Sequence, residues 1–546
     1  MRPRVLLVNP HYTAGCHLPA HAPAIVGKWP VANLVLPTLA ALTPRSFDVR
    51  IVDTAVEKLD FNTPCDIVGV TGYHSHLSTA RRIVTEFRKR GKLVVVGGPS
   101  VTTSPERWRP FADVLVLGEA ERTWPQFLRD FESGRHQTEY REAGKIDLAL
   151  TPLPRYDLLK PERYLAAVVQ PSRSCPFECE FCDVIVYLGR GIRYKPIDHV
   201  IGELQQVSDL GWRTCMLADD NLTADRQKAY ELMDAIRVWN ERREQPMIFI
   251  ASFSIDAARD PGICKLAAAA GINRVFIGIE SPNEECLRET KKRQNLRSDM
   301  RADLRKLFEF GIVPIGGTIV GFDHDDIDVF KKTYDFSQEC GIPIVNNYMM
   351  QAFDGTPLKA RMLQEGRYID WDDYEAVRDR EGLRLGLSYA TAPTIYPKNM
   401  TLRQLELGHT WLLQSLYQPE AFLDRVRRMF DILDTVPSSA VPEHRLWRVS
   451  FEEAKVIFRL LVYFARTRGG ERRLWKNIIR LGMKSSFSQR GALVAWLLLT
   501  YTSIRHNLIK IYHVDPLDSK DAPVYPVRPH SQTADATLPV DSVAAS

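Results

Sequence analysis

The chain has 546 residues, of which 45% are hydrophobic and 25% are charged, and it carries a formal net charge of +5. One hydrophobic core does not serve a chain of this length, so we expect three or four globular domains. The mild charge gives no reason to expect a nucleic-acid partner. The apolar runs fall short of the ~20 residues that span a bilayer, so we expect no membrane-spanning segment.

The cysteines indicate a reducing compartment. The sequence holds nine cysteines, and all but three of them stand alone. That is not the spacing of a disulfide framework, so we expect the protein to be cytoplasmic.

The first region, residues 1–145, alternates short apolar runs with helical patterns. Continuous β-branched runs separated by helices indicate a parallel sheet that is buried on both faces. We therefore expect an α/β domain with a five-stranded, doubly wound sheet, whose ligand lies beyond the carboxyl ends of the strands. The predicted strands cover residues 4–10, 47–54, 66–73, 92–100 and 112–121.

A second alternating series covers residues 165–370, after a proline-rich stretch, residues 146–164, that we interpret as a linker. Six β/α units fit a partial barrel better than a second open sheet, and such barrels carry their active sites at the carboxyl ends of the strands. The predicted strands cover residues 166–170, 212–219, 247–252, 274–280, 313–322 and 344–351.

The strand signal disappears in the last part of the chain. Amphipathic helical patterns fill residues 371–516 and predict a helical domain. Residues 517–546 are polar and proline-rich, which predicts a disordered tail.

Three cysteines stand close together just after the first predicted barrel strand. Cys175, Cys179 and Cys182 have the spacing C-x3-C-x2-C, and the next histidine is His199. A structural zinc ion takes four ligands, usually from two paired groups, so zinc is the less favoured interpretation. In a cluster of four irons, three thiolates leave one iron open to another molecule. The trio therefore favours an iron–sulfur cluster with an open corner.

This loop, with the aromatic Phe181 before its last cysteine, resembles the signature of the radical S-adenosylmethionine (SAM) enzymes. The resemblance implies a 4Fe-4S cluster on Cys175, Cys179 and Cys182, whose open iron chelates SAM for cleavage to a 5′-deoxyadenosyl radical. Residues at other strand ends fit a SAM site less specifically, since acidic residues also cap helices and glycines also make turns. The SAM-binding candidates are Phe181, Asp219, Asp220, Asn221, Glu280, Ser281 and Gly317, with Arg193 and Tyr194 as further candidates for positioning the nucleoside.

A doubly wound domain in front of such a barrel resembles the cobalamin-binding class of radical SAM enzymes, over roughly residues 1–370. The motif D-x-H-x-x-G, whose histidine ligates cobalt in many other enzymes, is absent from the sequence. Glycine pairs in three loops let backbone approach a large flat corrin. The cobalamin-binding candidates are Thr71, Gly72, Tyr73, His74, Gly97, Gly98, Ser100, Gly118 and Glu119. A surface position for His74, and a domain that binds nothing, remain alternatives.

The two cofactors together imply a C-methyltransferase. The radical removes hydrogen from an unactivated carbon, which then receives a methyl group from methylcobalamin, and positioning supplies much of the catalysis. Residues 347–368 and the helical tail resemble a subgroup that includes the hopanoid C-2 methylases. That resemblance implies a large apolar substrate and an electron donor such as a flavodoxin or ferredoxin. The alternatives are a cyclase or methylase acting on a tetrapyrrole or antibiotic intermediate, and a non-catalytic cobalamin or redox sensor.

Residues 466–510 interleave basic side chains with aromatic and aliphatic ones. This pattern suits an interfacial helix on an anionic membrane, and it also suits a solvated basic face over an ordinary helical cap. The sequence leaves both interpretations open, so peripheral contact at the inner face of the membrane is one alternative. The basic members are Arg466, Arg468, Arg472, Arg473, Lys476, Arg480, Lys484 and Arg490, and the apolar members are Trp475, Ile478, Ile479, Leu481, Phe487 and Trp496.

Overall fold

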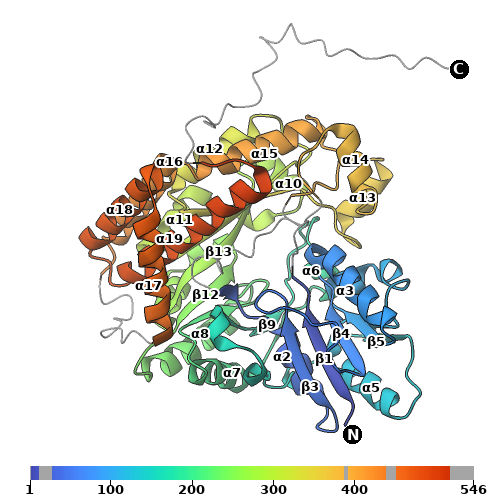
Figure 1. Cartoon of the computed structure of the whole chain (residues 1–546). Helices are drawn as coiled ribbons and strands as arrows, with labels where there is room; N and C mark the ends of the chain where they lie inside the picture. The colour runs from blue at the N-terminus through green and yellow to red at the C-terminus, as the bar shows by residue number, and fades with distance from the viewer. Residues whose placement is uncertain (1, 12–27, 387–390, 438–450, 517–546) are drawn as a thin grey trace, which may run out of the picture.

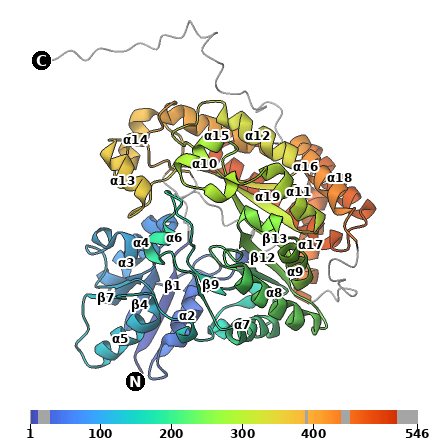
Figure 2. The same cartoon turned by 180° about the vertical axis from the view of Figure 1, so that it is seen from behind.

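The computed structural model of the chain describes residues 2–11, 28–386, 391–437 and 451–516. Figures 1 and 2 show an N-terminal sheet domain beside a curved second sheet, with the C-terminal helices against the outer side of the second sheet's helices. The predicted disordered tail, residues 517–546, lies outside the described residues.

The N-terminal domain is a parallel sheet with helices on both faces, as the sequence predicts. Its strand order is β3-β1-β4-β5-β6-β7, so the direction in which strands are added reverses between β1 and β4. The carboxyl ends of strands at such a reversal form a crevice that binds ligands in doubly wound folds. The strands are β1 (Arg4–Asn9), β3 (Asp48–Asp53), β4 (Ile67–Thr71), β5 (Leu93–Gly97), β6 (Val114–Leu117) and β7 (Glu139–Arg141).

Helices bury opposite faces of this sheet. Helix α3 (Leu77–Lys89) repeats apolar residues at helical spacing and buries Ile83, Val84 and Phe87 against one face. Helices α2 (Val35–Leu42) and α5 (Ala120–Glu132) cover the other face, where Trp124 and Phe127 are buried. The short helix α4 (Pro99–Thr103) follows β5 at the carboxyl edge.

The second sheet is a parallel half-barrel in the order β15-β14-β13-β12-β11-β8-β2. All six predicted barrel strands are present, which confirms the predicted fold class. The strands are β8 (Tyr164–Val169), β11 (Thr214–Leu217), β12 (Ile248–Phe253), β13 (Ile272–Glu280), β14 (Val313–Val320) and β15 (Ile344–Met349). The helices between them are α7 (Ile197–Asp209), α8 (Arg226–Glu241), α9 (Pro261–Ala270), α10 (Glu284–Glu289), α11 (Met300–Glu309) and α12 (Val329–Cys340).

Two short edge strands extend the predicted sheets. β7 adds a sixth strand to the first sheet, and β2 (Trp29–Val31) leaves the N-terminal region to pair in parallel with β8 of the barrel. Each has three residues and no apolar run, so the sequence carries no strand signal there. Because β2 crosses over, the barrel sheet begins within residues assigned to the first domain.

The C-terminal region is helical, as predicted. Helices α15 (Leu402–Leu416) and α16 (Pro419–Leu433) pack on barrel helices α12 and α11, and Tyr417 donates a hydrogen bond to the Val345 carbonyl of β15 at 2.9 Å. The other helices are α13 (Pro357–Gln364), α14 (Tyr374–Glu381), α17 (Phe451–Arg466), α18 (Gly469–Lys484) and α19 (Arg490–Asn507). Among the described residues, none of these helices is long and apolar enough to cross a membrane.

Candidate functional site

The cysteine loop projects from the carboxyl end of the first long barrel strand. Its two ends, β9 (Ser172–Arg173) and β10 (Arg193–Tyr194), form an antiparallel pair that closes the base of the loop. Cys175, Cys179 and Cys182 lie between these two strands, and the one-turn helix α6 (Val184–Tyr187) follows the last cysteine. The predicted position of the trio at the barrel mouth is therefore confirmed.

All three thiols are free, with Cys179 buried and the other two half-buried. Burial raises the pKa of each thiol, and it raises the pKa of Cys182 to about 12. A thiolate at this place therefore needs a positive partner, which bound iron supplies. Within the described part of the chain, no three His, Cys, Asp or Glu side chains are placed to hold a single metal ion, and this includes the trio. The donor set fits a cluster in which each of three irons takes one thiolate.

A second segment, Thr290–Asn295, packs against the cysteine loop. The Glu180 amide donates to the Thr290 carbonyl at 3.1 Å, and the Gln294 amide nitrogen lies 4.0 Å from the Cys179 sulfur. The Lys292 side chain is 15% exposed, and its ammonium pairs with Glu280 at 2.7 Å. Burial alone would lower the pKa of Lys292, but the charges of Glu280, Cys179 and Cys182 outweigh it and raise that pKa. One cation therefore lies beside the predicted cluster.

Replacing Lys292 with methionine is expected to lower the reduction potential of the bound cluster. The change removes a positive charge and leaves Glu280 unpaired, and both effects disfavour an added electron. We expect a shift of about 60 mV or more, which corresponds to ~1.4 kcal/mol for one electron. Redox titration followed by electron paramagnetic resonance measures it. Lys291→Met, at the exposed neighbouring position, is the control, and an equal shift in both variants would contradict this role.

Glu280 itself ends β13 in the left-handed region, with φ of 62°. A residue other than glycine adopts this conformation at a cost, so the surrounding contacts hold it there. Ser281 next to it is fully buried, and its hydroxyl accepts the Asn283 amide at 3.1 Å. Both predicted SAM-binding residues therefore lie at the mouth, close to the cysteine loop.

The acidic residues after β11 hold the start of the cysteine loop. The Asp219 carboxylate accepts the Ser172 amide at 2.6 Å and the Ser172 hydroxyl, and Asp220 accepts the Ser174 amide at 2.8 Å. Burial raises the pKa of both carboxyls, that of Asp219 to about 7. The second Asp219 oxygen is buried with no hydrogen-bond partner, so it stays available to a ligand.

Three other SAM-binding candidates have packing roles in this structure. Asn221 accepts the amides of Thr223 and Ser254 and so fixes the turn after β11. The Phe181 ring packs edge-on against Phe322, with centroids 6.5 Å apart. A Cβ at Gly317 would come within 2.5 Å of the Phe276 ring, so this glycine is needed by the core.

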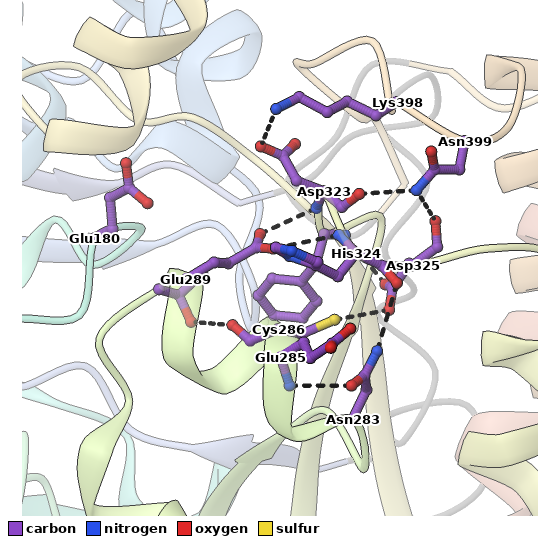
Figure 3. A network of polar contacts seen from close by, with 12 residues as sticks. Glu180, Asn283, Glu285, Cys286, Glu289, Asp323, His324, Asp325, Lys398 and Asn399 are labelled. Carbon is purple, nitrogen blue, oxygen red and sulfur yellow. Dashed lines mark hydrogen bonds and ion pairs between the residues drawn. The ribbon is translucent and has the colours of Figure 1, made fainter.

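The loop after β14, residues 321–328, is tied to helix α10 by a polar network (Figure 3). One Asp325 oxygen accepts the Gly321 and Phe322 amides, and the other accepts the Cys286 thiol at 3.1 Å. Burial raises the pKa of Asp325 to about 6. Glu289 accepts the amides of the two residues before Asp325. The network fixes one rim of the barrel mouth.

The same rim is joined to the cysteine loop through one arginine. Arg361 of α13 pairs with Glu180 at 2.8 Å and with Asp323 of the β14 loop. Lys398 also pairs with Asp323 at 3.1 Å, as Figure 3 shows. Nothing in the local sequence pattern predicts these contacts, because the partners are far apart in the chain.

Two glycine loops of the N-terminal domain touch each other closely. The Gly72 amide donates to the Gly97 carbonyl at 2.7 Å, and the Ser100 hydroxyl donates to the Gly72 carbonyl at 2.8 Å. A Cβ at Gly72 would lie 2.6 Å from Val101, and Gly98 has a φ of 117°. Glycine is therefore required here by the backbone, and the Ser100 hydroxyl is engaged within the protein.

A cavity of about 400 Å³ lies at the carboxyl edge of this sheet and reaches the cysteine loop. Its sheet wall is formed by β4, β5 and β6, with Trp124 of α5 beneath, and its far wall by Gln170, Tyr187 and Asp220 of the barrel side. Of the cobalamin-binding candidates, it brings together Thr71, Tyr73, Gly97, Gly98, Gly118 and Glu119. Its lining of apolar side chains with polar groups among them would hold part of a bound cobalamin.

Filling this cavity is expected to abolish cobalamin binding. Val95 lines the cavity from the middle of β5, so Val95→Trp places an indole in the space that a bound cobalamin would need. Absorbance titration with hydroxocobalamin measures the loss, and unchanged iron content shows that the barrel remains folded. Leu153→Trp, at an exposed position, is the control. Equal cobalamin affinity in both variants would rule out this cavity.

His74 and Tyr73 differ in their surroundings. Tyr73 lines the cavity, whereas the His74 ring lies 5.2 Å from that of Phe353, in the C-terminal half of the barrel. Burial lowers the pKa of His74 to about 4, so its imidazole is neutral at physiological pH. His74 therefore lies at the contact between the two domains. Thr71, another cobalamin-binding candidate, donates a hydrogen bond from its hydroxyl to the Asn9 side chain inside the first sheet.

Glu119 forms ion pairs with two arginines across the contact between the two domains. It pairs with Arg173 at 2.7 Å and Arg193 at 2.5 Å, the residues that open and close the cysteine loop. Glu121 pairs with Arg173 at 2.8 Å. Because Glu119 also lines the cavity, one carboxylate connects the predicted cobalamin site to the base of the cluster loop.

A second ion-pair cluster ties the N-terminal domain to the residues after β15. Arg107 pairs with Asp354, Asp370 and Asp372, and these contacts raise the pKa of Arg107 against the effect of its burial. Arg81 adds a pair to Asp372 at 3.1 Å. The two clusters fix the N-terminal domain on both sides of the barrel mouth.

The chain matches three protein families along its length. Residues 30–128 match the family described as B12 binding domain, residues 169–337 match the Radical SAM superfamily, and residues 356–513 match a domain of unknown function. A protein of Synechocystis sp. named uncharacterized methyltransferase sll1242 is 32% identical over 404 residues, which cover 73% of each chain. The chain belongs to the cobalamin-binding radical SAM family. Its cofactors are a 4Fe-4S cluster, SAM and cobalamin, and it is a radical SAM methyltransferase.

Two further relatives extend the comparison. The hopanoid C-2 methylase of Rhodopseudomonas palustris is 28% identical over 384 residues, covering 68% of this chain and 72% of the relative. The cobalamin-dependent radical enzyme OxsB, solved with aqua-cobalamin and SAM bound, has the same fold with a TM-score of 0.56, at 16% identity over 93% of this chain and 80% of that chain.

Proposed function

We propose that this methyltransferase methylates an unactivated carbon of a large apolar substrate such as a hopanoid, at a position like C-2. The observation that carries the proposal is the 28% identity to a hopanoid C-2 methylase, which extends over 72% of that enzyme. The other relative, at 32% identity, is also named a methyltransferase, so methyl transfer is what the two relatives have in common. The proposal therefore concerns the identity of the substrate and the carbon atom that is methylated.

In this proposal Cys175, Cys179 and Cys182 ligate the cluster. When bound, the cluster and SAM supply a carbon radical and cobalamin supplies the methyl group. Lys292 would offset the negative charge of the thiolates, and the unpartnered Asp219 oxygen and Glu280 are the groups that would bind SAM. Glu119, Arg173 and Arg193 keep the cavity and the cluster loop in one geometry, since methyl transfer needs both cofactors beside one carbon.

The chain also needs a one-electron donor, because SAM cleavage consumes an electron at each turnover. A flavodoxin or ferredoxin has the chemistry for this role. Mixing each donor, reduced, with the reconstituted protein under anaerobic conditions and following cluster reduction by electron paramagnetic resonance identifies it.

Deletion of the gene tests the substrate. We expect the lipid extract of the deletion strain to lose one or more methylated triterpenoids and to gain the forms lighter by one methylene unit, as measured by mass spectrometry. Complementation with the intact gene restores them, whereas the Cys182→Ala variant does not. An unchanged triterpenoid profile together with altered pigments would replace the hopanoid by a tetrapyrrole substrate.

A further inference from the structure

Helix α17 presents large apolar side chains to solvent. Phe458 is 65% exposed, Leu461 is 59% exposed and Ile457 is 45% exposed. Their spacing places them on one face of the helix. Soluble proteins rarely expose contiguous apolar patches unless the patch binds something.

Other residues of α17 pack on α18. The Phe464 ring stacks on Trp475 of α18 with centroids 5.5 Å apart, and the Tyr463 ring lies 5.6 Å from the same indole. The Tyr463 hydroxyl also donates to the buried Glu471 at 2.8 Å. Because these contacts anchor one side of α17, Phe458 and its neighbours point away from the protein.

Helix α18 adds a stripe of positive charge. Arg473, Lys476, Arg480 and Lys484 recur every three or four residues, are exposed, and have no ion pair within the described ranges. The acidic residue of α18, Glu471, is buried and pairs with Arg505 at 3.0 Å. Arg237 of α8 and Lys331 of α12, which are also basic helix residues, each pair instead with a carboxylate four residues on. At the end of the stripe Met483 is 73% exposed.

These positions revise the expectation for residues 466–510. Trp475, Ile478 and Phe487 are buried in the core, and Trp496 stacks on Arg274 at 4.8 Å, so they are not available to a membrane. The basic residues of α18 are available, and the exposed apolar residues are at positions 457–461 of α17, before that range.

We propose that α17 and α18 form a docking surface for an anionic phospholipid bilayer. Exposed apolar side chains on α17 and unpaired basic ones on α18, the helix that it contacts, are groups that suit the acyl boundary and the anionic headgroups of a membrane. Figures 1 and 2 show α18 at the outer edge of the helical region, away from the N-terminal domain. Gln489, just before α19, contacts Asn273, and Trp496 of α19 contacts Arg274; both partners are at the start of β13, so this region lies toward the amino ends of the barrel strands. The surface therefore anchors the protein and leaves the mouth open, and it does not depend on which substrate is methylated.

Co-sedimentation of the full-length protein with vesicles tests this surface. We expect binding to vesicles of phosphatidylglycerol and phosphatidylcholine at low salt, and loss of most binding in high salt or on phosphatidylcholine alone. Phe458→Ser/Leu461→Ser and Arg473→Gln/Lys476→Gln/Arg480→Gln should each weaken binding by tenfold or more. Circular dichroism and cobalamin binding show that both variants remain folded.

The matched control is Arg301→Gln/Arg305→Gln/Lys331→Gln, which removes as many positive charges from exposed positions on α11 and α12. It should bind as the original chain does. Equal loss in the control would show that only net charge matters, and absence of binding to anionic vesicles would overturn the proposal. If light scattering shows a dimer that the Phe458→Ser/Leu461→Ser variant dissociates, a second copy covers this surface instead.

Discussion

Replacement of Cys175, Cys179 and Cys182 by alanine is expected to abolish iron binding completely. The three thiolates are the donors that the loop brings to the barrel mouth, and a cluster without them has no attachment to the protein. Anaerobic reconstitution of the unaltered chain should yield about four irons per chain with broad visible absorbance. Iron and sulfide analysis of the triple variant should yield background values.

The matched control replaces three isolated, buried cysteines, Cys65, Cys264 and Cys340, with alanine. This variant removes the same number of thiols and should keep its full iron content. Iron retained by the Cys175/Cys179/Cys182 variant would show that other residues hold the cluster.

Arg173→Met is expected to lower the free energy of unfolding by roughly 3–5 kcal/mol, because it leaves two buried carboxylates without their shared partner. Glu119 and Glu121 are 6% and 3% exposed and both pair with Arg173. Arg193 remains on Glu119, so the greater loss is at Glu121. Urea unfolding measures the change, and cobalamin and iron occupancy should fall together, since the same contacts join the two domains.

Two further variants separate this effect from a general loss of charge. Arg237→Met removes an exposed arginine that also pairs with two carboxylates, and it should leave the free energy of unfolding nearly unchanged, because solvent screens these pairs. Adding Glu121→Gln to Arg173→Met should restore part of the stability, because a neutral amide tolerates burial better. If Arg173→Met and Arg237→Met have the same free energy of unfolding, the pairing of Arg173 with Glu119 does not stabilise the contact between the two domains.

The fold is predictable where the signal is local. Apolar runs such as Leu93–Gly97 and Ile272–Glu280 are long, β-branched and separated by helical patterns, so both sheets are evident in the sequence. The edge strands Trp29–Val31 and Glu139–Arg141 are not, because three residues at an edge need no apolar run. Trp29–Val31 also pairs with a strand more than 130 residues away, and the hydrophobic periodicity of a segment does not predict its partner strand.

The candidate site is likewise predictable only where its signal is local in sequence. The cysteine spacing lies within eight residues of chain, so it was recognisable, whereas the contacts that support it join residues far apart in sequence. Asp219 and Asp220 were predicted at the mouth, but their hydrogen bonds to Ser172 and Ser174 cross 46–47 residues. Glu119 was predicted to meet cobalamin, and its pairing with Arg173 and Arg193 follows only from how the domains dock.

Measuring the two products that the intact protein forms from SAM tests whether it transfers methyl groups by radical chemistry. Anaerobic protein with full cluster and cobalamin occupancy, supplied with SAM, a reductant and a triterpenoid extract, should release 5′-deoxyadenosine and S-adenosylhomocysteine in equal amounts. Each transfer uses one SAM for the radical and one for the methyl group. Formation of S-adenosylhomocysteine without 5′-deoxyadenosine, or of neither product, would contradict radical methyl transfer by this chain.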